Sequence, residues 1–212
     1  MTRILLIRHG QSVSNIQGVF TGHLDLELTE LGRQQAQLTS EFILNKYQVD
    51  AVYASDLRRA ADTGRTVSEP LGLPLQTDRR LREIYAGSWE GKSFDELTET
   101  SPSYAVFRSD IGNCQTDGGE SVEQLSNRVL QAFTQIAAEN ETKTVVIATH
   151  ATPIRSIMTY CYGKPLSQMK DVPWVTNASV TEVIFDGGKF RLGEICQDAH
   201  LGSIVSRFPS NV

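Results

Sequence analysis

The stretch LLIRHGQS, residues 5–12, is an apolar run that ends abruptly in an arginine and a histidine. A continuous apolar run of this kind is typical of a central strand that is covered on both faces. Such a strand has no use for two polar side chains at its end unless an anionic or reactive group lies there. We therefore expect Arg8 and His9 to follow a buried strand and to belong to a functional site.

A second stretch, TVVIATH at residues 144–150, repeats the pattern of an apolar run that ends in a histidine. Ligands of an open α/β sheet bind in the crevice beyond the carboxyl ends of its strands. One histidine at a strand end would most simply be a satisfied core or surface residue. Because two of the four histidines in the chain occupy such positions, we expect His9 and His150 to face the same crevice.

Apolar runs and helical patterns alternate along the rest of the chain. Strands are predicted at 3–7, 50–55 and 144–150, helices at 28–46, 56–72, 120–140 and 152–163, and an antiparallel hairpin at 180–195. This order predicts an α/β protein, a three-layer α/β/α sandwich with a largely parallel central sheet and one antiparallel edge strand. We expect a single domain over residues 1–212, with 92–118 as a short lid-like insertion that covers the substrate.

Side chains near the helix ends predict where those helices begin. Thr29 is the expected N-cap of one helix, and Ser121 with Gln124 forms a capping box at another. The helix after His150 is expected to be capped by Thr152, with Pro153 in its first position. Since a helix N-terminus attracts anions, this end of the helix is a candidate anion site.

The composition limits the classes of partner. A net charge of −5 argues against nucleic acid and against a membrane surface, and no apolar run is long enough to span a bilayer. Three widely spaced cysteines, Cys114, Cys161 and Cys196, have no assigned role and favour a reducing compartment. With no signal peptide evident, we expect a cytoplasmic protein. A homodimer is left open.

Two further residues are candidates for the same site. Arg59 lies on the helix that follows the strand at 50–55, and Glu83 lies among glycines and apolar residues in LREIYAGSWEG at 81–91. Each has an ordinary alternative, because Arg59 could be an exposed surface residue and Glu83 could pair with a neighbouring arginine. Two histidines and a glutamate could also bind metal, but no spacing typical of metal ligands supports this, and no metal is expected.

Arginine, histidine and glutamate side chains around one crevice suit phosphoryl transfer. A neutral imidazole attacks phosphorus, while cations neutralise the charge on the phosphoryl oxygens. A carboxylic acid protonates the leaving oxygen and then activates water.

Six blocks of the sequence together resemble the histidine phosphatase superfamily, also called phosphoglycerate mutase-like. They are LIRHGQSVSN (6–15), TGHLDLELTELGRQQA (21–36), SDLRRAADT (55–63), LREIYAGSWEG (81–91), GGES (118–121) and ATHATPIR (148–155). The resemblance implies that His9 is the nucleophile that becomes phosphohistidine, that Arg8 and Arg59 clamp phosphate, that Glu83 donates a proton, and that His150 is a second phosphate-binding histidine.

The resemblance also implies a substrate loop and a reaction class. Asn15, Thr21 and Gly22 match the loop that contacts phosphate or substrate, and Ala151 stands at the pocket mouth where the family usually has glycine. The short insertion is similar to that of the small bacterial phosphatases, which implies hydrolysis of a small phosphorylated metabolite without cofactor or metal. A phosphoglycerate mutase and a non-enzymatic phosphate-binding protein remain as alternatives, and the substrate is not named.

Overall fold

The two histidine-terminated runs form neighbouring strands at the centre of the sheet. In the computed structural model, which describes residues 1–206, β1 (Thr2–Arg8) pairs in parallel with β4 (Thr144–Thr149). The register places Arg8 beside Thr149. His9 and His150 therefore leave the sheet side by side, as the sequence predicts.

The sheet has six strands in the order β3-β2-β4-β1-β5-β6. β2 (Ala51–Ala54) and β3 (Leu75–Thr77) extend the parallel part, whereas β5 (Val180–Asp186) and β6 (Lys189–Leu192) are antiparallel. The largely parallel sheet and the hairpin are thus confirmed. The antiparallel edge is the hairpin of β5 and β6, and β3 is not predicted from the sequence.

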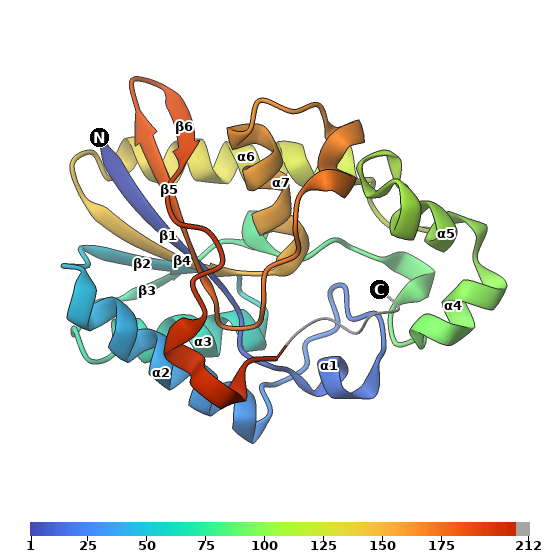
Figure 1. Cartoon of the computed structure of the whole chain (residues 1–212), viewed down its shortest axis with the longest axis horizontal. Helices are drawn as coiled ribbons and strands as arrows, with labels where there is room; N and C mark the ends of the chain where they lie inside the picture. The colour runs from blue at the N-terminus through green and yellow to red at the C-terminus, as the bar shows by residue number, and fades with distance from the viewer. Residues whose placement is uncertain (207–212) are drawn as a thin grey trace.

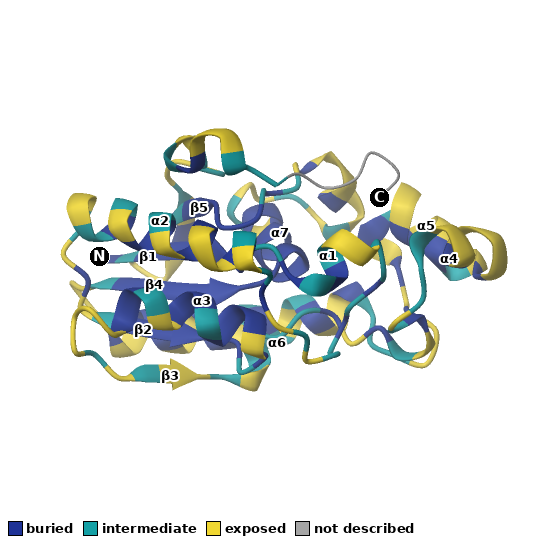
Figure 2. Cartoon of the chain, turned by 90° about the horizontal axis from the view of Figure 1, so that it is seen from below, coloured by how far each residue is buried: buried dark blue, intermediate teal, exposed yellow. Residues whose placement is uncertain are grey.

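Helices cover both faces of the sheet, so the predicted three-layer sandwich is confirmed (Figure 1). One layer holds α2 (Glu30–Lys46) and α3 (Arg58–Ser68), and the other holds α6 (Val122–Glu139) and α7 (Ala151–Cys161). Alternate residues of a strand point to opposite faces. Both faces of β1 are accordingly apolar and buried, as Figure 2 shows for the central strands.

The caps of α2 and α6 are confirmed, and the cap of α7 is wrong. Thr29 accepts a hydrogen bond from the Gly32 amide, and Ser121 forms its capping box. The cap of α7 is His150, in an extended conformation, so the helix begins two residues earlier than the expected cap at Thr152 implies. Thr152 and Pro153 therefore lie inside the first turn, where a proline is tolerated because the first four helical N–H groups have no partner in the helix.

The segment 92–118 consists of short helices, α4 (Phe94–Thr100) and α5 (Pro102–Ser109), as its mixed pattern indicates. It lies at one end of the molecule near α1 (Val13–Gln17), a helix that the sequence analysis does not predict (Figure 1). The Phe20 amide donates to the Lys92 carbonyl at 2.9 Å, which fixes the start of the segment beside the loop after α1. Within residues 1–206, no helix has the length and apolar character needed to cross a membrane.

Candidate active site

His9 directly follows β1 and is almost fully buried. Its Nδ1 lies 2.7 Å from the Gly10 carbonyl oxygen. A carbonyl only accepts, so Nδ1 carries the proton and Nε2 keeps its lone pair. Burial, and then the positive charges of Arg59 and Arg8, hold the pKa of His9 well below its usual value. The result is a neutral imidazole with a nucleophilic Nε2.

His150 lies against His9, with the two ring centroids 5.2 Å apart in an edge-to-face arrangement. Burial, followed by the charge of Arg59, lowers the pKa of His150 well below its usual value. Neither of its ring nitrogens has a hydrogen-bond partner among the described residues. Buried polar atoms are seldom left in this state, so these nitrogens are suited to a ligand.

Two arginines provide positive charge beside His9, and each is no more than 2% exposed. Arg59 donates to the carbonyl oxygens of Gly22 at 2.9 Å and Leu24 at 2.8 Å, and Arg8 donates to that of Val175 at 2.6 Å. Burial lowers the pKa of each guanidinium to about 10, which leaves both charged at neutral pH.

Arg59 forms no ion pair with any carboxylate in the described part of the chain. Glu83, Asp25 and Glu90 favour its charge from a distance, but none contacts the guanidinium, and a bound anion would add the direct partner that the buried charge lacks. Arg58, its neighbour in the sequence, is exposed instead and lies 3.7 Å from Glu27. The arrangement selects Arg59 as the arginine that faces the site.

Glu83 presents its carboxylate to the same region. Its Oε1 accepts from the Ile84 amide at 2.8 Å, and its Oε2 accepts from the Thr152 amide in the first turn of α7 at 3.4 Å. The alternative that Glu83 pairs with Arg79, Arg80 or Arg82 is wrong, because Glu83 forms no ion pair within the described residues. Arg80 pairs with Asp78 and Arg82 with Asp56 instead.

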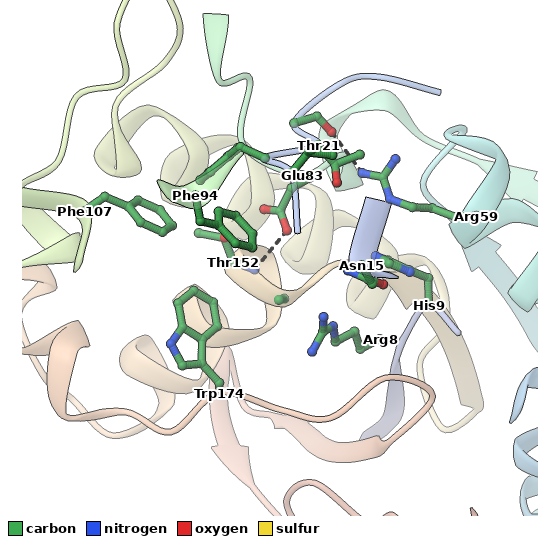
Figure 3. A pocket seen from close by; sticks show the side chains of 14 residues that line it. Arg8, His9, Asn15, Thr21, Arg59, Glu83, Phe94, Phe107, Thr152 and Trp174 are labelled. Carbon is green, nitrogen blue, oxygen red and sulfur yellow. Dashed lines mark hydrogen bonds between the residues drawn. The ribbon is translucent and has the colours of Figure 1, made fainter. Parts of the chain in front are cut away.

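One pocket gathers all of the sequence-predicted site residues except His150, which packs against His9 and does not line the pocket. The predicted residues that line it are Arg8, His9, Asn15, Thr21, Gly22, Arg59, Glu83 and Ala151. Figure 3 shows Arg8, His9 and Arg59 at one side and three aromatic rings at the other, with Glu83 between them. The pocket thus joins a cationic end to an apolar end.

A family model described as the histidine phosphatase superfamily (branch 1) matches residues 4–198. The chain belongs to the histidine phosphatase superfamily.

Relatives and solved structures agree with this assignment. The chain is 32% identical to phosphoglycerate mutase-like protein 4 of Arabidopsis thaliana, over 97% of this chain and 90% of the relative. It is 34% identical to putative phosphoserine phosphatase 2 of Hydrogenobacter thermophilus, over 91% of this chain and 94% of the relative. The structure of YhfR from Bacillus stearothermophilus is similar with a TM-score of 0.90 and 31% identity, covering 95% of this chain and all of that one.

α1 and the loop after it line the pocket of this histidine phosphatase with Asn15, Thr21 and Gly22. Asn15 accepts from the Ser12 amide at 3.0 Å and from Asn177 at 3.2 Å, and Thr21 donates to Ser14 at 2.6 Å. Gly22 has a φ of 50°, and a Cβ there would lie 2.3 Å from a carboxylate oxygen of Glu90. Glycine is therefore required where the loop carbonyl meets Arg59.

Sequence reasoning missed the apolar side of the pocket. Phe94 and Phe107 come from α4 and α5, and Trp174 comes from the segment between α7 and β5 (Figure 3). Single aromatic residues in segments without clear periodicity carry no signal that separates a pocket wall from ordinary core. Within the described residues, no group of three His, Cys, Asp or Glu side chains is placed to hold a metal ion.

Proposed function

We propose that this histidine phosphatase hydrolyses a small phosphorylated metabolite through a phosphohistidine on His9. The observation that carries the proposal is the state of His9, a neutral imidazole with its proton on Nδ1, beside a buried arginine that no described carboxylate pairs. The family membership and the phosphatase named among the relatives support the same reaction class.

The first half of the reaction transfers the phosphoryl group to the protein. Nε2 of His9 attacks phosphorus as the bond to the ester oxygen breaks, and Glu83 donates a proton to that leaving oxygen. Arg8 and Arg59 contact the phosphoryl oxygens from the pocket wall and stabilise the charge that they carry in the transition state. His150 packs against His9, and its ring nitrogens, which have no described partner, are available to bind a phosphoryl oxygen once the substrate is seated.

The second half releases phosphate. Glu83, now a carboxylate, takes a proton from a water molecule whose oxygen attacks phosphorus, and the bond to Nε2 breaks. Thr21, Gly22 and Asn15 hold the substrate loop in this proposal, and Ala151 limits the width of the pocket mouth. Neither half of the reaction requires a metal ion or a cofactor.

The segment 92–118 is proposed to cover the substrate. Phe94 and Phe107 from this segment line the pocket and would contact the carbon part of the metabolite. All six strands belong to one sheet, which supports the expected single domain over residues 1–212. Residues 207–212 of that domain lie outside the described residues.

Replacement of His9 tests the proposal. We expect His9→Ala to abolish phosphate release while thermal unfolding remains cooperative, because the apolar part of β1 is unchanged. Acid-labile phosphate should be trapped on the wild-type protein during turnover and be absent from the variant. His200→Gln, which replaces a histidine stacked on Phe42, serves as the control and should keep activity. Turnover by His9→Ala within tenfold of the wild type would overturn the proposal.

A further inference from the structure

The loop that carries Glu83 is held from behind by a side chain of α6. Arg128 donates from Nη1 to the carbonyl oxygens of Arg80 at 2.8 Å and Arg82 at 2.7 Å, and from Nη2 to that of Glu83 at 2.8 Å. Three carbonyls of one short loop thus converge on a single guanidinium. Arg128 does not line the catalytic pocket.

Glu120 completes the contact from the other direction. It forms an ion pair with Arg128 through both of its carboxylate oxygens, and its Oε1 also accepts from the Tyr85 amide at 2.9 Å. The pair therefore binds carbonyls before and at Glu83 and an amide after it. Because the two charges neutralise each other outside the pocket, the pair fixes the backbone and does not provide charge for the phosphoryl group.

A third contact ties this loop to the phosphate-binding arginine. Nε2 of His23 lies 2.9 Å from the Glu83 carbonyl oxygen, to which it donates. Burial lowers the pKa of His23, so the ring is neutral at pH 7. His23 lies between Gly22 and Leu24, whose carbonyls hold Arg59. The backbone of Glu83 is thus connected to the position of Arg59.

We infer that Arg128, paired with Glu120, is a positioning residue that sets where Glu83 delivers its proton; the inference rests on the proposed function. The Glu83 carboxylate has only two described contacts, and the one to α7 is long at 3.4 Å. Its location therefore depends on the backbone beneath it. A displacement of about 1 Å at a reacting group costs roughly 100-fold in rate.

The test replaces the guanidinium of Arg128 and keeps its positive charge. Arg128→Lys removes the planar arrangement that three carbonyls and a carboxylate share, and a lysine cannot reproduce it. The quantity measured is the single-turnover rate of enzyme phosphorylation. We expect a loss of roughly 100-fold with an alkyl phosphate, and a much smaller loss with p-nitrophenyl phosphate, whose leaving group scarcely needs the proton.

Two comparisons separate positioning from general damage. Arg65→Lys, at an exposed ion pair with Asp62, should leave both rates unchanged. In a Glu83→Gln background, Arg128→Lys should cause no further loss with the alkyl phosphate, because both changes remove the same proton transfer. Should Arg128→Lys fail to fold, Glu120→Gln must show the same selective loss.

The outcomes distinguish the inference from the function on which it rests. Equal losses with the two substrates in Arg128→Lys, or additive losses in the double variant, would overturn the positioning role and leave the phosphatase proposal intact. If Glu83→Gln alone shows no dependence on the leaving group, the proton-donor role of Glu83 fails, and the inference about Arg128 fails with it.

Discussion

His9 and His150 are buried as neutral rings, and this state links the active site to the stability of the protein. Burial is the largest cause of the low pKa of each ring. Both side chains become accessible on unfolding and then titrate near pH 6.5. The native protein therefore binds fewer protons than the unfolded chain once the pH falls below that value.

The sign of the pH dependence follows directly. Above about pH 6.5 both states are neutral and the two histidines contribute no pH dependence. As the pH falls from there toward 5, the free energy of unfolding decreases, by about 1.4 kcal/mol per pH unit for each such histidine. Thermal unfolding in phosphate-free buffer at several pH values measures this slope. His150→Gln should flatten it, and an unchanged slope would contradict the buried neutral state.

Arg59 and Arg58 are adjacent in sequence and opposite in environment, which gives a matched pair of variants. Arg59→Ala should lower kcat/KM by roughly a hundredfold or more, because a preorganised donor to developing charge is worth ~3 kcal/mol. Arg58→Ala removes only an exposed contact to Glu27 and should stay close to the wild-type rate. Steady-state kinetics on one substrate measures kcat/KM for both variants. A larger loss in Arg58→Ala than in Arg59→Ala would show that Arg58, and not Arg59, faces the site.

At the scale of elements, the loop after β1 touches the first turn of α2 without any side chain between them. A Cβ on Gly32 would lie 2.0 Å from the Gln11 carbonyl oxygen, and one on Gly10 would lie 2.3 Å from the Gly32 carbonyl oxygen. The nucleophile loop therefore rests on the first turn of a helix at backbone contact.

Gly32→Ala should push the two elements apart. We expect a destabilisation of about 1–3 kcal/mol, typical of overpacking, together with a loss of kcat as the His9 loop moves. Gly64→Ala is the comparison within α3, since its Cβ would lie 3.0 Å from the movable end of Leu75 and 3.3 Å from the Cβ of Ala54, with no backbone atom among these contacts, and alanine favours the helix. Denaturant unfolding and steady-state kinetics are measured on both variants. If Gly32→Ala loses no more stability or kcat than Gly64→Ala, the backbone contact at Gly32 adjusts without cost and the prediction is wrong.

Long periodic elements could be predicted from the sequence, and short ones could not. β1, β4 and α6 bury enough apolar residues for periodicity to identify them, whereas α2 buries mostly polar residues and is marked by its Thr29 cap and its length. β3 spans only three residues and exists because it pairs with β2, a contact that no local pattern encodes.

The candidate site was predictable for a similar reason. Each residue that lines the cationic end follows a strong strand or belongs to a recognisable block of sequence. Arg128 and Glu120 had no such signal, because they act on backbone groups of a loop that lies about forty residues earlier in the chain. Thr152 was misplaced as a cap because the preceding histidine already turns the chain into α7.

At the scale of the whole molecule, a negatively charged protein concentrates buried positive charge in one pocket. The net charge is −5, yet Arg8 and Arg59 lie together beside His9. In the proposed reaction, these side chains provide the charge that a divalent ion would otherwise supply to a phosphoryl group. EDTA should leave phosphate release unchanged. Loss of activity in EDTA that a divalent ion restores would contradict this expectation.

The strand order has a consequence for how the chain acquires its activity during synthesis. β1 is the first strand to be synthesised, and it lies between β4 and β5, both of which the ribosome synthesises much later. Contacts between segments this far apart form slowly, and an unpaired apolar strand invites association with other chains. An emerging polypeptide therefore carries His9 without a complete site, and both edges of its central strand stay unpaired and prone to aggregation until the last third of the chain appears.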